Sequence, residues 1–324
     1  MYGLQVIFDL FISSRSIPYV YSRGCNYFIA MQNTSIYKVI LIFTGLILLN
    51  CSSPAEKASK LHVFVTIPPQ KYFLEKIGKD LVQINTLIPP GASPHSYEPK
   101  PSQLTGLSRT KLFFAIGGDF EGAWLPRICK DLSGLKVVFA LNEHSGAQSD
   151  KCPNHDHDHH RHSQGHDPHI WLSPEQVLHM ADIIAIELSA ADSVNRDQYL
   201  NNCSLFKDEI RDLQNKIRAN LNGCTPGHPF MVFHPSWGHF ASEFDLSQIS
   251  VEIDGKEPGM REMQNIIDIA EKKKIRTIFV QPQFSKRSAQ TISDQLKLKV
   301  SVADPLAENW AENLLKISEA LGKE

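Results

Sequence analysis

The chain has no excess of positive charge, since 33 lysines and arginines stand against 35 aspartates and glutamates and the formal net charge is −2. Nucleic-acid binding needs basic side chains that neutralise phosphates, so we expect no nucleic-acid partner. Common catalytic signatures are missing as well. There is no His-Glu-x-x-His motif, and no Ser-His-Asp or Cys-His arrangement stands in a supporting context. We therefore do not expect an enzyme.

The N-terminal region lacks a hydrophobic run long enough to cross a membrane. The apolar run 39–49 has about 11 residues, whereas a membrane-spanning helix needs about 20. Lys38 precedes it and Asn50-Cys51 follows it, the pattern of a secretory signal with a processing site. The ending resembles a lipobox, although Asn50 replaces the usual small residue. We expect residues 1–51 to be a signal segment ending in a lipidated Cys51, with Met31 as the true start.

The remaining cysteines give no clear disulfide framework. Cys203 and Cys224 fall near opposite ends of one expected helix and should not pair. Cys129 and Cys152 are able to pair in an oxidising compartment, but nothing in the sequence requires it.

Beyond residue 61, strand-like apolar runs alternate with helical patterns, which predicts parallel sheets covered by helices. The expected strands are 62–67, 82–88, 111–116 and 136–141 in the first half, and 230–234, 249–253, 276–281 and 298–303 in the second. The expected helices include 72–77, 101–107, 261–273, 289–296 and 310–321. The fold class is therefore α/β, with two lobes that each contain a mainly parallel sheet flanked by helices.

One long helix is expected to join the lobes. Residues 195–222 contain neither proline nor glycine, and their apolar residues recur every three or four positions, as on one face of a helix. Such a helix would be about 40 Å long. We expect an N-terminal lobe over 52–193, a linking helix over 194–222 and a C-terminal lobe over 223–324.

Three histidines and one aspartate stand where an α/β protein binds ligands. His95 follows an expected strand in a loop with three prolines, and His169 comes two residues after a carboxylate in the loop that closes the first half. His234 and Asp304 lie at or just beyond expected strand ends. Open α/β sheets bind ligands at the carboxyl ends of their strands.

Any one of these residues is most simply explained as a turn residue beside a proline, but four of them, two from each half, predict one metal site. Three imidazoles and a carboxylate suit zinc, and manganese or iron remain alternatives. Five other histidines are expected to be structural or on the surface: His62, His144, His179, His228 and His239.

A histidine-rich loop forms a second expected metal-binding element. Of the 14 histidines, six lie in the segment 154–166: His155, His157, His159, His160, His162 and His166. Short histidine-rich tracts bind transition metals by composition. Because these ligands are not held in place, we expect weak binding of variable stoichiometry; a merely solvated polar loop is the alternative.

Several ordered motifs resemble the metal-specific solute-binding proteins of bacterial ABC importers, and the zinc-binding branch most of all. The motifs are Ile67-Pro-Pro, Ile88-Pro-Pro-Gly-Ala-Ser-Pro-His-Ser-Tyr-Glu-Pro, Gly117-Gly-Asp-Phe-Glu, Asp167-Pro-His-Ile-Trp-Leu-Ser-Pro, Phe233-His-Pro-Ser-Trp-Gly, Gln281-Pro-Gln-Phe and Ala303-Asp-Pro. The resemblance covers the chain from about Leu61 to the end. It implies two α/β lobes joined by a long helix, with the metal between them.

The resemblance also implies a function and a place in the cell. His95, His169 and His234 would be ligands. Histidine rather than a carboxylate at 234 favours Zn2+ over Mn2+, and Gln281 departs from the glutamate that the family often has. The chain would capture zinc in the periplasm or on the outer face of the cytoplasmic membrane and deliver it to an ABC permease. The alternatives are a manganese or iron importer component, a metal-binding adhesin and, less favoured, a zinc hydrolase with Glu98 or Glu121 as base.

Overall fold

The computed structural model describes residues 60–94, 96–117, 119–129, 134–139, 167–253, 256–283, 290 and 293–323. All of them belong to one compact unit, Ser59–Glu324. The signal segment with Cys51, the histidine-rich loop, His95 and Cys152 lie outside the described residues. No helix in the described part of the chain combines the length and apolar character needed to span a bilayer.

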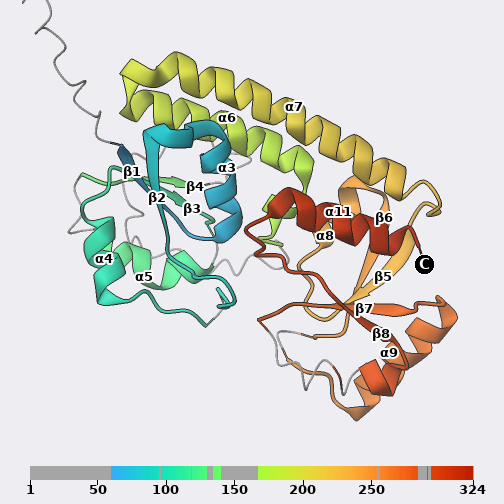
Figure 1. The fold of residues 1–324 in the computed structure, drawn as a ribbon. Coiled ribbons are helices and arrows are strands. Elements are labelled where there is room, and N and C mark those ends of the chain that lie inside the picture. Colours follow the sequence, from blue (N-terminus) through green and yellow to red (C-terminus); the bar gives the residue numbers. More distant parts are fainter. Residues whose placement is uncertain are drawn as a thin grey trace, which may run out of the picture. The chain divides into compact units, whose positions relative to one another are not determined.

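The first sheet contains four parallel strands in the order β2-β1-β3-β4 (Figure 1). The strands are β1 (Leu61–Val65), β2 (Val82–Thr86), β3 (Leu112–Ala115) and β4 (Lys136–Phe139). Helix α3 (Pro68–Gly78) connects β1 to β2, α4 (Pro101–Leu107) leads to β3, and α5 (Asp119–Cys129) leads to β4. Parallel neighbours need such crossover connections, and the α/β prediction for this half is confirmed.

The second sheet repeats the topology with the order β6-β5-β7-β8. Its parallel strands are β5 (His228–Val232), β6 (Leu246–Ser250), β7 (Thr277–Val280) and β8 (Lys299–Val302). Its helices are α8 (Gly238–Glu243), α9 (Met260–Lys272) and α11 (Trp310–Leu321). Of the helix expected over 289–296, residue 290 and residues 293–296 are described, and they are helical.

One strand lies three residues earlier than expected. The apolar residues at 249, 251 and 253 suggested a strand over 249–253, but β6 begins at Leu246. Asp245 adopts a left-handed conformation with φ of 52°, which turns the chain from α8 directly into β6. The helices α5 and α8 were not expected, because their short apolar patterns did not stand out from the surrounding turns.

A long helix joins the two sheets, as expected. Helix α7 (Arg196–Asn220) buries one face, formed by Cys203, Phe206, Ile210, Leu213 and Ile217. It packs against α3 of the first half and α11 of the second. Helix α6 (Pro174–Ala191) runs beside it (Figure 1). Cys203 is a buried free thiol, so the prediction that it does not pair with Cys224 is confirmed.

The main hydrophobic core continues through both halves. One cluster of buried side chains includes Val63 and Val65 of β1, Phe206 of α7, and Val232 and Phe279 of the second sheet. Smaller clusters cover the opposite face of each sheet, beneath α4 and α5 in one half and α9 in the other. The shared core and α7 therefore join both sheets within one unit.

Candidate metal centre

His169 is held in a fixed orientation by a carboxylate two residues earlier. It lies just before a 3-10 turn, η2 (Ile170–Leu172), and is 8% exposed. Asp167 Oδ1 accepts a hydrogen bond from His169 N at 2.9 Å and lies 2.6 Å from His169 Nδ1. Because an ionised carboxylate only accepts hydrogen bonds, Nδ1 carries a proton and Nε2 is the nitrogen that can bind a metal.

The His169 ring also keeps this carboxyl group ionised. Burial by itself would raise the pKa of Asp167, but the hydrogen bond and charge of His169 outweigh that effect, and the pKa lies below its usual range. Asp167 therefore remains a strong acceptor for the imidazole.

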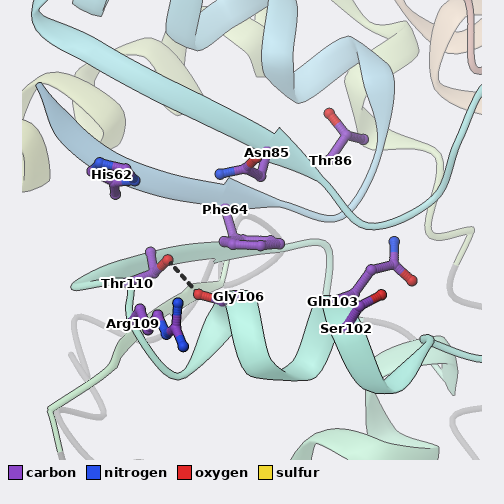
Figure 2. Close-up of a pocket in the computed structure, with 9 residues that line it drawn as sticks. All are labelled: His62, Phe64, Asn85, Thr86, Ser102, Gln103, Gly106, Arg109 and Thr110. Atoms are coloured by element: carbon purple, nitrogen blue, oxygen red, sulfur yellow. Dashed lines mark hydrogen bonds between the residues drawn. The ribbon is translucent and has the colours of Figure 1, made fainter.

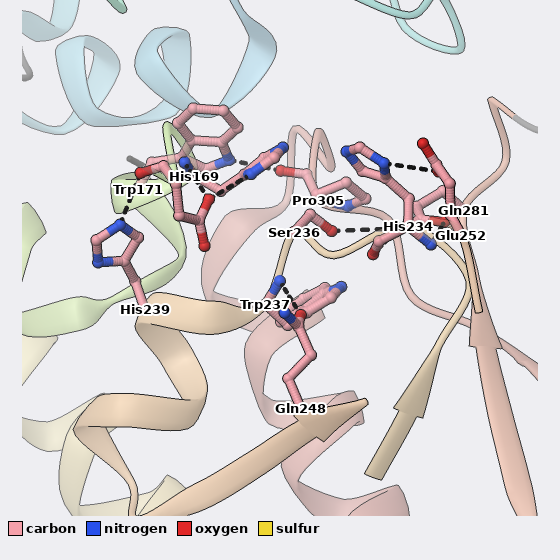
Figure 3. A network of polar contacts seen from close by, with 11 residues as sticks. His169, Trp171, His234, Ser236, Trp237, His239, Gln248, Glu252, Gln281 and Pro305 are labelled. Atoms are coloured by element: carbon pink, nitrogen blue, oxygen red, sulfur yellow. Dashed lines mark hydrogen bonds and ion pairs between the residues drawn. The ribbon is translucent and has the colours of Figure 1, made fainter. Parts of the chain in front are cut away.

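His234 has the same kind of support from a more distant residue. It lies two residues beyond β5, and its Nδ1 is 2.9 Å from Oε2 of Glu252, which follows β6 (Figure 3). Burial lowers the pKa of His234, and the hydrogen bond and charge of Glu252 only partly oppose the shift. The imidazole is thus biased toward its neutral form, which is the form that ligates metals.

The two imidazoles lie close together, and both line one small cavity. Their ring centroids lie 5.4 Å apart with an interplanar angle of 75°. Two imidazoles that bind one tetrahedral zinc at about 2.1 Å place their ring centres roughly 5 Å apart. The cavity measures about 30 Å3 and is lined by Ser93, Pro94, His169, Trp171, His234, Gln281, Gln283, Pro305 and Leu306. The structure therefore brings together His169 and His234 in a geometry that fits one shared ion.

The other two expected ligands are His95 and Asp304. His95 is outside the described residues, but Ser93 and Pro94, which directly precede it, line the cavity. Asp304 precedes the lining residue Pro305, and its Oδ1 accepts hydrogen bonds from Gln283 Nε2 at 2.8 Å and from Leu306 N at 3.0 Å. Within the described ranges no group of three or more His, Cys, Asp or Glu residues can hold a metal, so a full ligand set needs a further donor such as His95.

Gln281 fixes the backbone that carries His234. This side chain is 3% exposed. Its Nε2 donates to His234 O at 3.0 Å and to Ser236 Oγ at 3.2 Å, and its Oε1 accepts from His234 N at 3.4 Å. A glutamate carboxylate would lack the donor for the contact with His234 O, so an amide at this position serves to hold the loop.

Other contacts tie the segment around His169 to the second half of the chain (Figure 3). His239 Nε2 lies 2.9 Å from Asp167 O. Trp171 Nε1 donates a hydrogen bond to Pro305 O, and Trp310 Nε1 donates one to Trp171 O, both at 2.7 Å. Sequence reasoning missed these partners, and it missed Glu252. A correct placement of β6 would have put Glu252 just beyond a strand end, beside the other site residues.

A larger cavity in the first half does not resemble a metal site. It measures about 580 Å3 and is lined by His62, Phe64, Asn85, Thr86, Ser102, Gln103, Gly106, Arg109 and Thr110 (Figure 2). It shares no residue with the cavity at His169 and His234. Its only imidazole is His62, with no carboxylate beside it among the lining residues, so size alone does not mark the functional site.

Comparison with known proteins identifies the family of the chain. Residues 63–321 match the model of the family described as zinc-uptake complex component A, periplasmic. The high-affinity zinc uptake system protein ZnuA of Bacillus subtilis is 26% identical over 78% of this chain and 81% of its own length. A crystal structure of ZnuA covers 82% of this chain and 99% of its own, with 36% identity and a TM-score of 0.73.

A longer relative is also similar. The zinc-binding lipoprotein AdcA of Streptococcus pneumoniae is 24% identical over 85% of this chain, and the chain spans about half (56%) of AdcA. The similarity to the shorter ZnuA proteins, in contrast, extends over most of both chains. Because the family model covers most of the sequence and both halves of the fold, this chain belongs to the ZnuA family of solute-binding proteins, which are not enzymes.

Proposed function

We propose that the protein captures zinc outside the cytoplasm and delivers it to an ABC-type membrane importer. The observation that carries the proposal is the pair of imidazoles of His169, which is buried, and His234, which is partly buried; their ring centroids lie 5.4 Å apart and each ring is backed by a carboxylate. The names of relatives support the choice of zinc, since the B. subtilis and S. pneumoniae proteins are a zinc uptake protein and a zinc-binding lipoprotein.

In this proposal His95, His169 and His234 ligate the ion, and Asp304 or a water molecule takes the fourth position. Asp167 and Glu252 fix the rings of His169 and His234 so that one nitrogen of each is ready to bind, which reduces the ordering that capture requires. Imidazoles bind a metal ion in their neutral form, and the amides of Gln281 and Gln283 carry no charge. Such a nitrogen-rich site favours zinc over manganese, which prefers more oxygen ligands.

Metal titration of the purified protein tests this function. We expect one tight zinc site per chain and a preference for zinc when manganese or iron competes. In His234→Glu, an oxygen ligand replaces a nitrogen ligand, and selectivity should move toward manganese. A wild-type protein that prefers manganese over zinc would refute the zinc assignment.

The proposed location rests on the sequence of the N-terminal segment. We propose that residues 1–51 direct export and that Cys51 becomes the lipidated N-terminus. Mass spectrometry should find a mature chain that begins at Cys51 and partitions with membranes, whereas Cys51→Ala should release the protein or stall its processing. A mature N-terminus at another residue would contradict the lipid anchor without affecting the zinc site.

A further inference from the structure

The glutamine between the histidine cavity and Asp304 is anchored in one orientation. Gln283 Nε2 donates to Asp304 Oδ1 at 2.8 Å, and the same oxygen accepts from Leu306 N at 3.0 Å. An ionised carboxylate only accepts hydrogen bonds, so the end of Gln283 that faces Asp304 is its NH2 group. The other end of the amide is therefore the oxygen Oε1.

That oxygen is an acceptor without a donor. Gln283 Oε1 is buried and has no hydrogen-bond partner in the described part of the chain. A buried acceptor left in this state is costly, and buried polar groups in native proteins nearly always find a partner. Gln283 also lines the cavity of His169 and His234. The residues that line the cavity thus include two imidazoles and an amide whose oxygen can accept one more O–H or N–H group.

A water molecule on a bound zinc ion supplies such a group. Zinc lowers the pKa of its bound water, in some sites to about 7, and thereby makes that water a strong hydrogen-bond donor. The cavity of about 30 Å3 exceeds the roughly 10–15 Å3 that one water needs. The cavity that the two histidines and Gln283 line therefore has room for a water molecule.

We propose that Gln283 accepts a hydrogen bond from a water molecule that completes the coordination of the captured zinc. Asp304 then acts through Gln283, by holding its amide, and does not ligate the ion. The inference rests on the proposed function, because it takes zinc as the cargo. A neutral amide holds a water without removing its proton, whereas hydrolytic zinc sites place a general base beside that water. Gln283 thus suits a carrier.

A double-variant cycle separates this arrangement from direct ligation by Asp304. Zinc affinity is measured by chelator competition for the wild type, Gln283→Met, Asp304→Ala and the double variant. Gln283→Met should raise the Kd about tenfold, as for a lost hydrogen bond to a charged group, and Asp304→Ala by a similar or smaller factor. The double variant should bind no more weakly than Gln283→Met alone, because the two residues act in series. If the Kd of the double variant rises by the product of the two single-variant factors, the proposal is overturned.

X-ray absorption of the zinc-loaded proteins measures the number of atoms bound to zinc, which a general loss of stability does not change. The wild type and Gln283→Met should show the same four nitrogen or oxygen neighbours, because the water stays bound. A missing neighbour in Gln283→Met would mean that Gln283 itself ligates, and an unchanged Kd would remove it from the site. Either result overturns the inference. If Gln283→Met does not fold, Gln283→Leu takes its place in both measurements.

The wild-type titration is performed first, so that the two proposals fail separately. A wild type with no tight zinc site refutes the proposed function. If the wild type has such a site but the Kd factors of the two single variants multiply in the double variant, only the role of Gln283 is refuted.

Discussion

The two halves of the protein present a histidine in the same chemical way but by different routes along the chain. Their sheets have the same strand order, and each half backs an imidazole with a carboxylate on Nδ1. In the first half the carboxylate is Asp167, two residues from His169. In the second half it is Glu252, which is 18 residues from His234 and follows a different strand.

The difference shows what local and tertiary structure each contribute to the site. The Asp167–His169 pair forms within a single turn, and the carboxylate also accepts from the His169 backbone. The His234–Glu252 pair exists only when β5 and β6 are paired in register, with Met231 opposite Ile249. The geometry of His234 therefore depends on the second sheet, whereas much of the geometry of His169 is contained in its own loop.

The largest effect is expected from removal of either histidine. His169→Ala and His234→Ala should each weaken tight zinc binding at least tenfold, because each removes one ligand from the ion. His95→Ala should behave in the same way, and Asp304→Ala should have a smaller effect. Isothermal titration at neutral pH measures the series. His179→Ala is the matched control, since His179 is exposed, and undiminished affinity in all three histidine variants would refute the site.

Neutralising the supporting carboxylates should have the next largest effect. Changes in residues that orient metal ligands typically cost about 10–100-fold in affinity, so Asp167→Asn and Glu252→Gln should each weaken zinc binding about tenfold. We expect the larger loss for Asp167→Asn, because Asp167 contacts both the ring and the backbone of His169. The exposed Glu257→Gln serves as control. A larger loss for Glu252→Gln would show that tertiary support matters more than local support.

The sequence predicted the parts of the site that are local. The Asp-Pro-His motif drew attention to His169 and a strand end to His234, which both line the cavity, because both signals lie within a few residues. Glu252 was missed because its position depends on where β6 begins, and the left-handed Asp245 that sets this start gives only a weak sequence signal. Gln283 was missed because its role follows from the contact with Asp304, 21 residues away.

The fold was predictable for a similar reason. Strands buried on both faces appear as short apolar runs, and the α7 pattern repeats every three or four residues over 25 residues. Helices α5 and α8 lack such repetition: α8 has only 6 residues, and α5 contains Pro126. They form because neighbouring elements cover them, which a single sequence does not reveal.

A smaller effect on zinc affinity is expected from a change at Gly238, where the start of α8 approaches Asp167. A Cβ atom added to Gly238, at the start of α8, would lie 2.5 Å from Asp167 Oδ2, closer than such atoms approach in proteins. Gly238→Ala should displace Asp167 and so disturb His169 from the opposite half, weakening zinc binding several-fold. Gly223→Ala is the control, since a Cβ there meets no atom within 4 Å. Equal zinc affinity of the two variants would show that Asp167 moves without cost to the site.

The smallest effect on the tight site is expected from deletion of the histidine-rich segment. We propose that the six histidines of 154–166 collect additional zinc, as short histidine-rich tracts do by composition. The cavity is lined by residues outside this segment, and its two imidazoles are fixed by Asp167 and Glu252. A chain without residues 154–165 should therefore lose zinc equivalents at saturation while one site keeps its wild-type Kd.

Equilibrium dialysis at saturating zinc gives the stoichiometry of this deletion variant, and chelator competition gives the Kd of its tight site. Replacing the histidines of the segment with serine at constant length separates the loss of ligands from the shortening of the loop. Ligands that are not held in place lose conformational entropy when they bind an ion, whereas preoriented ligands lose little. Both variants should therefore lose only weak sites. If either variant loses the tight site, the histidine-rich segment is the principal site and the cavity of His169 and His234 is secondary.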